Sequence, residues 1–195
     1  MNLLLIFSRW FIRKKPKHCL SHSAQISPKA KITGKVFIDE NTYIGHSQII
    51  ATENFIVTIG KETKIRDNSL IKTNESEVIE SSVKDIHGIF IGSKVFISSE
   101  VTIYGSCIVS DRTFIGSKVK IENAIIGSGC LIEDNVTIKN TIIPSDTVIP
   151  SNTIINSTED LEKVLSQQNT GDYCKYSPTN KKLKYSAINP TKSSI

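Results

Sequence analysis

The sequence has few aromatic residues, no long apolar run and no regular cysteine framework. Only 7% of its 195 residues are Phe, Trp or Tyr, and its apolar content comes mainly from Ile and Val, which favours strands over a helical bundle. No apolar stretch approaches the roughly 20 residues of a membrane span. The four cysteines are Cys19, Cys107, Cys130 and Cys174. They form no CxxC pair, so we expect reduced thiols in an intracellular compartment rather than disulfides or a zinc knuckle.

Acidic residues are scarce at both ends of the chain. Residues 1–35 carry eight Lys or Arg and no acid, and residues 170–195 carry five Lys against the single Asp172. Residues 36–169 therefore hold 11 basic and 18 acidic side chains, a net charge of −7, although the whole chain carries +5. A nucleic-acid-binding body would need a basic face of its own. We therefore expect no nucleic-acid partner.

An aliphatic residue, usually Ile, recurs every six residues through most of the chain. A small or β-branched residue often stands four places after it, as Thr42, Val95 and Thr113 do, and Gly often follows it directly. The recurring positions include Ile26, Ile32, Ile38, Ile44, Ile50, Ile59, Ile65, Ile71, Ile91, Ile97, Ile103, Val109, Ile115, Ile121, Ile126, Ile138, Ile143, Ile149 and Ile155. Three hexapeptides make one triangular turn of about 18 residues, with the aliphatic residue inward. The repeat predicts an all-β fold, a left-handed parallel β-helix.

The repeat divides the chain into segments. We predict a basic amphipathic N-terminal extension over residues 1–23 and the β-helix over residues 24–156, interrupted by a loop insertion at 72–90. Residues 157–168 predict a short α-helix, and residues 169–195, rich in Lys, Ser, Thr and Asn, a flexible basic tail.

The short helix has the signals of a helix start. Ser157 or Thr158 is expected to be its N-cap, and Leu161, Val164 and Leu165 share one apolar face.

The N-terminal extension admits three interpretations. As a helix it would place Leu3, Leu4, Phe7 and Phe11 on one face. It is basic and free of acids, which is typical of a mitochondrial presequence. Such a helix could equally lie on a membrane or partner surface, or pack over the open first coil of the β-helix.

Two stretches are similar to γ-class carbonic anhydrases, namely IRDNSLI at 65–71 and the run at 90–116. That resemblance implies three zinc-binding His, at the positions that Lys72, Ser99 and Tyr104 occupy here. None of these side chains replaces a neutral imidazole at zinc. We therefore predict no catalytic, cofactor-binding or metal-binding residues, and no enzymatic activity.

Other polar and thiol side chains allow two interpretations each. His87, in the predicted loop, is the only candidate general base for acyl transfer, although an ordinary loop His is favoured, and His46 is expected to face solvent. Cys107 and Cys130 stand at the small corner position, so we expect core residues. Eight acidic side chains fall at turn positions, as a solvated face or as a docking surface for a basic partner; they are Glu53, Glu62, Asp67, Glu100, Asp111, Glu122, Glu133 and Asp134.

Three further stretches resemble the small hexapeptide-repeat subunits of the dynactin pointed-end complex, dynactin subunit six among them. They are IIATENFIVTIGKETKIRDNSLI (49–71), IGSKVKIENAIIGSGC (115–130) and IIPSDTVIP (142–150), and the resemblance extends over residues 24–156. It implies a scaffold or adaptor in the cytoplasm and cytoskeleton that links dynein to cargo. Its partners would be other pointed-end subunits or a paralogous β-helix.

Two alternatives to the dynactin interpretation stay open. One is a mitochondrial γ-carbonic-anhydrase-like subunit of a respiratory complex. The other, less favoured, is a hexapeptide-repeat acyltransferase.

Overall fold

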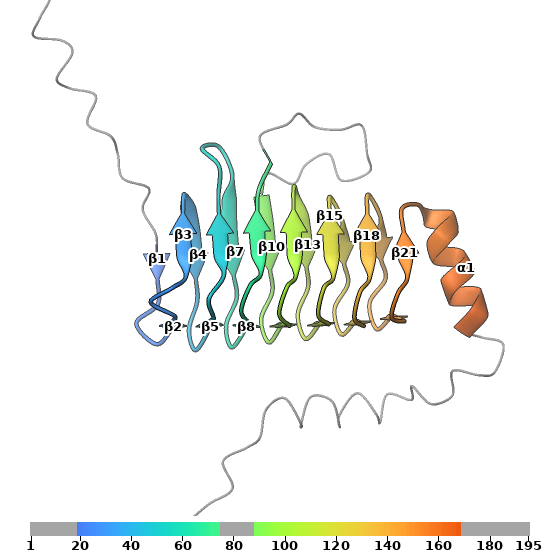
Figure 1. Cartoon of the computed structure of the whole chain (residues 1–195), viewed down its shortest axis with the longest axis horizontal. Helices are drawn as coiled ribbons and strands as arrows, with labels where there is room; N and C mark the ends of the chain where they lie inside the picture. Colours follow the sequence, from blue (N-terminus) through green and yellow to red (C-terminus); the bar gives the residue numbers. More distant parts are fainter. Residues whose placement is uncertain (1–18, 75–87, 169–195) are drawn as a thin grey trace, which may run out of the picture.

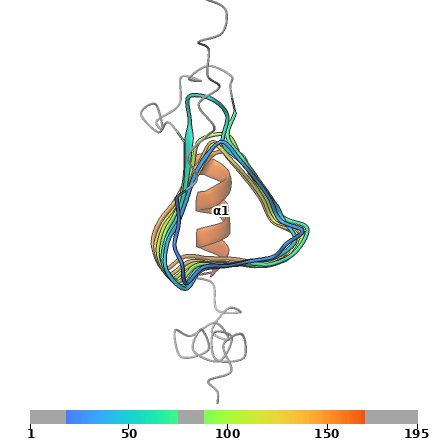
Figure 2. The same cartoon turned by 90° about the vertical axis from the view of Figure 1, so that its left-hand side faces the viewer.

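The computed structural model describes residues 19–74 and 88–168. Over these residues the chain forms a left-handed parallel β-helix followed by one α-helix (Figure 1). Viewed along its axis, the β-helix has a triangular cross-section with one parallel sheet on each side (Figure 2). Each sheet contains seven strands in the described residues, so the β-helix has about seven turns. The fold class predicted from the hexapeptide repeat is confirmed.

The three sheets, which we call A, B and C, alternate along the chain. Sheet A comprises β1 (Cys19–Leu20), β4 (Lys35–Ile38), β7 (Ile56–Ile59), β10 (Gly88–Ile91), β13 (Cys107–Val109), β16 (Ile125–Ile126) and β19 (Ile142–Ile143). Sheet B comprises β2 (Gln25–Ile26), β5 (Tyr43–Ile44), β8 (Lys64–Ile65), β11 (Phe96–Ile97), β14 (Phe114–Ile115), β17 (Leu131–Ile132) and β20 (Val148–Ile149). Sheet C comprises β3 (Lys31–Thr33), β6 (Gln48–Ile50), β9 (Leu70–Lys72), β12 (Thr102–Tyr104), β15 (Lys120–Glu122), β18 (Thr137–Lys139) and β21 (Ile154–Ile155).

The inward side chains form continuous rows along the axis. In sheet C, the register pairs Ile103 of β12 with Ile71 on one side and Ile121 on the other. These three side chains are at most 1% exposed. Strands of two to four residues have little stability alone, and here each is held by the strands of the neighbouring coils. The rows of inward aliphatic residues are therefore both the core and the register of the fold.

The small polar residues at the corners bond the coils to one another. The Thr63 hydroxyl donates to the carbonyl of Gly92 at 2.7 Å, and the Thr113 hydroxyl donates to the carbonyl of Gly127 at 2.9 Å. Both threonines are fully buried. A buried hydroxyl is tolerated when it is hydrogen-bonded, and these bonds join each coil to the next. The corner position therefore selects for small size and, in several coils, for a donor.

One predicted core position is wrong by one residue. Ile49 is fully buried, whereas Ile50, predicted inward, lies on the outer side of sheet C and is half-buried. The corner that precedes this strand contains only Gly45, His46 and Ser47 between β5 and β6. The corresponding corner in the next coil contains four residues, 66–69. The shorter corner reduces the step between inward residues, and a shift of one residue reverses which side chain faces the core.

The boundaries of the β-helix differ in part from those predicted. Strand β1 begins at Cys19, so the first coil includes residues that the sequence assigned to the extension. The insertion predicted at 72–90 is too long at both ends, because Lys72 belongs to β9 and residues 88–90 belong to β10. Residues 75–87 between these strands lie outside the described residues. The predicted extension up to residue 18 and the predicted tail at 169–195 also lie outside them.

A short α-helix, α1 (Thr158–Gln168), closes the C-terminal end of the β-helix (Figures 1 and 2). Leu161 is buried and, with Val164 and Leu165, packs on the core, next to β21.

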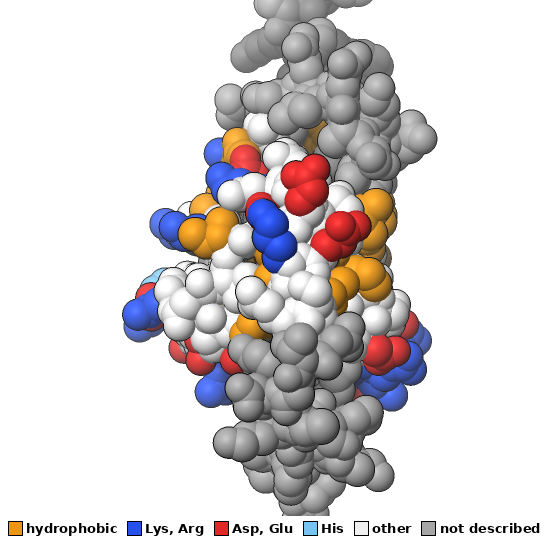
Figure 3. Space-filling view, turned by 90° about the vertical axis from the view of Figure 1, so that its right-hand side faces the viewer, with side chains coloured by type: hydrophobic (Ala, Val, Ile, Leu, Met, Phe, Trp, Pro, Cys, Tyr) orange, Lys and Arg blue, Asp and Glu red, His pale blue; other side chains and the backbone are white. Residues whose placement is uncertain are grey.

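Ser157 is the N-cap of α1, because its hydroxyl accepts the backbone N–H of Asp160 at 3.2 Å. The Asp160 carboxylate in turn accepts the N–H of Asn156, which lowers the pKa of that carboxyl. Charged side chains of α1 face outward over this end (Figure 3).

The corners require left-handed backbone conformations. Twelve non-glycine residues in the described chain have positive φ, and six of them are Asn. Lys118 also adopts this conformation, with φ at 60°. A Lys side chain gains nothing that offsets the steric cost of this region, whereas Gly has no such cost.

We therefore expect Lys118→Gly to raise the free energy of unfolding by about 0.5–1 kcal/mol. The matched control is Lys120→Gly, an exposed position in strand β15, which should destabilise the protein by a similar amount. Thermal unfolding followed by circular dichroism measures both. A lower melting temperature for Lys118→Gly than for the unmodified chain would contradict the assignment of strain to this corner.

Candidate functional site

The three positions that correspond to zinc ligands lie on the outer side of sheet C and at the corner next to it. Lys72 and Tyr104 lie side by side on β9 and β12, on the outer side of sheet C. Ser99 lies at the corner that precedes β12. In the part of the chain that the structure describes, no group of three or more His, Cys, Asp or Glu is placed to hold a metal ion.

The described histidines stand apart from one another. His22 and His46 are exposed and lie at corners on opposite edges of sheet B. The backbone N–H of His46 donates to the Asp67 carboxylate at 2.6 Å, which leaves its ring at the surface. The candidate base His87 lies outside the described residues, as does His18.

Several acidic turn residues have a structural role that sequence reasoning missed. The carboxylates of Asp111 and Asp134 accept the backbone N–H of Ser93 and Ser117, both at 2.7 Å, and Asp67 does the same for His46. In each case the acceptor comes from the next coil. A sequence pattern accompanies this contact. Gly and a second residue follow the inward Ile, and one coil later Asp stands at the position equivalent to that second residue. These carboxylates bond the coils and are not simply a solvated face.

The outer side of sheet A carries an apolar row, which we call the apolar face of sheet A. The register places its members in line across the sheet, interrupted only by Thr58; they are Phe37, Phe90, Ile108, Ile125 and Ile142. Phe37 is 40% exposed and Ile142 is 48% exposed. The outer rows of sheet C are mainly polar. An apolar outer row is therefore not a requirement of the fold.

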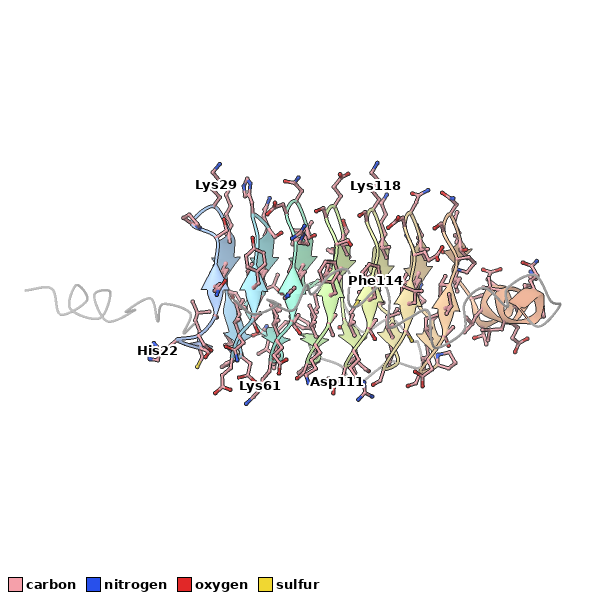
Figure 4. All side chains as sticks on the ribbon, turned by 90° about the horizontal axis from the view of Figure 1, so that it is seen from below. His22, Lys29, Lys61, Asp111, Phe114 and Lys118 are labelled. Carbon is pink, nitrogen blue, oxygen red and sulfur yellow. The ribbon has the colours of Figure 1, made fainter. Side chains whose placement is uncertain are left out.

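The outer side of sheet B is divided into two parts. Towards the C-terminal end its row continues through Phe96, Phe114, Leu131 and Val148. The Phe96 and Phe114 rings are stacked, with centroids 5.3 Å apart and planes within 1° of parallel. Figure 4 shows Phe114 on this face, between the corners that carry Lys118 and Asp111.

Towards the N-terminal end, the same side of sheet B is hollowed. A shallow depression of about 400 Å³, which we call the sheet B hollow, lies over the first four coils. Its lining is Ser23, Gln25, Asn41, Thr42, Tyr43, Lys64, Arg66 and Phe96. The lining thus combines cations, amides, hydroxyls and aromatic rings, and it contains no carboxylate.

The two thiols predicted to be core residues are buried. Cys107 and Cys130 are at most 1% exposed, and their thiols donate to the carbonyls of Tyr104 and Pro144 at 3.3 and 3.1 Å. Burial raises the pKa of the Cys107 thiol to about 11. A thiol in this state is neutral at physiological pH and a poor nucleophile. Cys107 is therefore a packing residue.

The comparisons with known proteins agree with the fold. No protein-family profile matches the sequence. Over 114 residues the chain is 27% identical to the carboxysome assembly protein CcmM of Nostoc sp., which covers 58% of this chain but only 20% of that protein's length. A crystal structure of a Bacillus cereus protein assigned as an acetyltransferase superposes with a TM-score of 0.60. Its identity is 20%, and the match covers 80% of this chain and 88% of that one. A hexapeptide transferase family protein from Anaplasma phagocytophilum gives a TM-score of 0.43 at 16% identity, covering 79% and 88%.

The chain has the same β-helix fold as the Bacillus cereus protein. The prediction that the chain is not an enzyme is corrected by this comparison, because its structural neighbour with a TM-score of 0.60 is assigned as an acetyltransferase. The prediction rested on the zinc ligands of a single enzyme class. Acyl transfer depends on a positioned general base rather than on three zinc-bound histidines. The residues Lys72, Ser99 and Tyr104 therefore do not exclude catalysis.

The dynactin resemblance gains no support from these comparisons. The relatives named above include no dynactin subunit, so that assignment stays a prediction. Within the described residues, no helix has the length and hydropathy of a membrane span.

The burial of the thiols predicts their reactivity. In the native protein at pH 8, a disulfide reagent such as DTNB should modify the exposed Cys19 rapidly. Cys107 should react on the order of 100-fold more slowly, because raising its pKa by about 2 lowers the thiolate fraction by that factor. The double variant Cys19→Ser/Cys174→Ser isolates the two buried thiols. It should react slowly in the native state and rapidly once denaturant is added, and fast native modification would contradict the burial of Cys107 and Cys130.

Proposed function

We propose that this chain is a structural subunit of a protein assembly, in which the apolar face of sheet A packs against a second β-helix. The observation that carries the proposal is the row of Phe37, Phe90, Ile108, Ile125 and Ile142 on an otherwise solvent-facing side. Burying such side chains against a partner is favourable by about 25 cal/mol per Å² of apolar surface. The relative CcmM, described as an assembly protein, adds support.

The geometry of the face favours a β-helix as the partner. The apolar face of sheet A spans six strands, from β4 to β19, and a spacing of about 4.8 Å makes it a straight row roughly 24 Å long. The face of another β-helix has the same spacing, so outward side chains of the two can interdigitate along the whole row. The partner is either a second copy of this chain or a paralogue, since both offer the same surface chemistry.

The cellular setting is part of the same proposal. The sequence stretches at 49–71, 115–130 and 142–150 favour the dynactin pointed-end complex, in the cytoplasm and cytoskeleton, as the assembly. The basic extension at 1–23 favours a mitochondrial respiratory complex as the alternative. Localisation of a fluorescent fusion of the full chain separates the two.

The experiment compares two exposed isoleucines on different sides. Ile142 lies on the apolar face of sheet A, and Ile154 lies on sheet C, with 48% and 63% of their surface exposed. The full chain, tagged at its C-terminus, is purified from native extract as wild type, Ile142→Lys and Ile154→Lys. We expect wild type and Ile154→Lys to retain a β-helical partner, and Ile142→Lys to lose at least about tenfold of it, because a buried charge without a counter-ion is costly.

Mass spectrometry and sedimentation identify the partner. Either a homo-oligomer or a complex with a paralogous β-helix would support the proposal. The composition of the complex would show whether the partner is a second copy of this chain or a paralogue. A monomer without a β-helical partner would overturn it. Equal partner recovery with Ile142→Lys and Ile154→Lys would overturn the assignment to sheet A.

A second candidate function is acyl transfer. The observation that favours it is the superposition on the Bacillus cereus protein assigned as an acetyltransferase. On this proposal His87 is the general base. We expect any acetyl-CoA-dependent activity of the full chain to fall about 100-fold or more in His87→Ala and to persist in His46→Ala. Unchanged activity in His87→Ala would remove His87 from that role.

A further inference from the structure

The sheet B hollow lies on a different side of the β-helix from the apolar face of sheet A. Its floor is the outer row of the first four coils, in which Gln25, Tyr43, Lys64 and Phe96 stand next to one another in register. Figure 4 views this side directly. The row is flanked by the corner residues Ser23 and Asn41.

Two cations project from the same strand region into the hollow. Lys64 and Arg66 are two residues apart, so both point outward from sheet B. When the register is continued by one residue, the strand neighbours of Arg66 are Gly45 and Ser98. Gly45 has no side chain and that of Ser98 is small, so neither of these strand neighbours places a bulky group beside Arg66. The hollow thus presents the N–H donors of Arg66 next to the strand position of Lys64.

Two of the nearby carboxylates, those of Glu62 and Asp67, have partners outside the hollow. Glu62 lies 4.0 Å from the Lys94 ammonium, at the adjoining corner. Asp67 accepts the backbone N–H of His46 on the opposite corner. The outward positions of sheet B in the first four coils carry no acidic residue. A positive patch therefore stands on a body whose residues 36–169 carry a net charge of −7.

Aromatic rings complete the hollow. Phe96 stacks on Phe114 on its C-terminal side, so its other face is turned towards the coil of Lys64. Tyr43, which is 37% exposed, stands on the far side of Lys64. Flat rings next to cations and amides fit a ligand that combines a planar ring with an anionic group.

We propose that the sheet B hollow binds a mononucleotide, with Lys64 and Arg66 holding its phosphate oxygens and with Tyr43 and Phe96 packing against its base. Bidentate Arg–phosphate contacts supply both affinity and orientation. The volume of about 400 Å³ is at the small end of the range for small-molecule sites. The surrounding net negative charge disfavours a long polyanion such as RNA. The proposal is independent of the docking role of sheet A.

The test is titration calorimetry of the full chain with ADP as the probe. We expect a saturable site that Arg66→Gln weakens by about tenfold to a hundredfold, because a charge-assisted hydrogen bond is lost. Lys64→Gln should weaken it similarly. The matched control is Lys120→Gln, on the outer side of sheet C, which should leave ADP affinity unchanged. Circular dichroism verifies that each variant is folded.

Further probes separate the two halves of the ligand. Adenosine and inorganic phosphate should each bind at least tenfold more weakly than ADP, since each keeps only one set of contacts. Adenosine binding as tightly as ADP would overturn the role of the cations, and inorganic phosphate binding as tightly would overturn the role of the rings. An oligonucleotide that binds more tightly than ADP, with the same loss in Arg66→Gln, would overturn the choice of a mononucleotide. Absence of ADP binding would overturn the proposal as a whole.

Discussion

The structure depends on the register between successive coils. Every strand is too short to persist alone, so each inward Ile is placed only by the Ile above and below it. The corner hydroxyls of Thr63 and Thr113 and the carboxylates of Asp111 and Asp134 hold the same register from the edges. Burial of the hydrophobic rows stabilises the fold, and the hydrogen bonds at the corners fix the position of each coil along the axis. Displacement of one coil would break contacts on three sides at once.

This constraint also explains where the chain accommodates irregular lengths. Between β9 and β10 the sequence inserts residues 73–87, and yet β10 pairs in register with β7 and β13, aligning Ile91 with Ile59 and Val109. The same edge of the triangle accommodates the longer connection between β6 and β7. An insertion at a corner changes no inward position, so its cost is confined to the loop. Additional sequence is therefore tolerated where it leaves the rows intact.

The sequence could predict the rows of inward aliphatic residues. It could not predict the irregular positions in these rows or the arrangement of the residues on the outer faces of the sheets. The six-residue spacing of Ile identifies the β-helix because the core needs one inward aliphatic residue per side. It fails at Ile50, since a corner shortened by one residue changes the step and brings Ile49 inward. The left-handed conformation of Lys118 could not be predicted from its residue type. Half of the non-glycine residues with positive φ are Asn, whereas Lys is not a residue type that favours this conformation. The hollow around Lys64 and Arg66 escaped detection because it arises from neighbours about 20 or more residues apart, which only the register brings together.

In a β-helix the inward residues determine the fold, and the outward residues can change without altering the core. The fold therefore does not determine the function. Residues such as Lys72 and Tyr104 face outward on sheet C, so replacing a ligand there leaves the inward row unchanged. The lack of zinc ligands on sheet C is therefore no evidence about binding or catalytic sites on sheets A and B. Sheets A and B meet at the corner that carries Lys61 and Asp111 (Figure 4). A partner seated flat on the apolar face of sheet A ends at that corner. The sheet B hollow then stays open to solvent, and docking and ligand binding are compatible in one subunit.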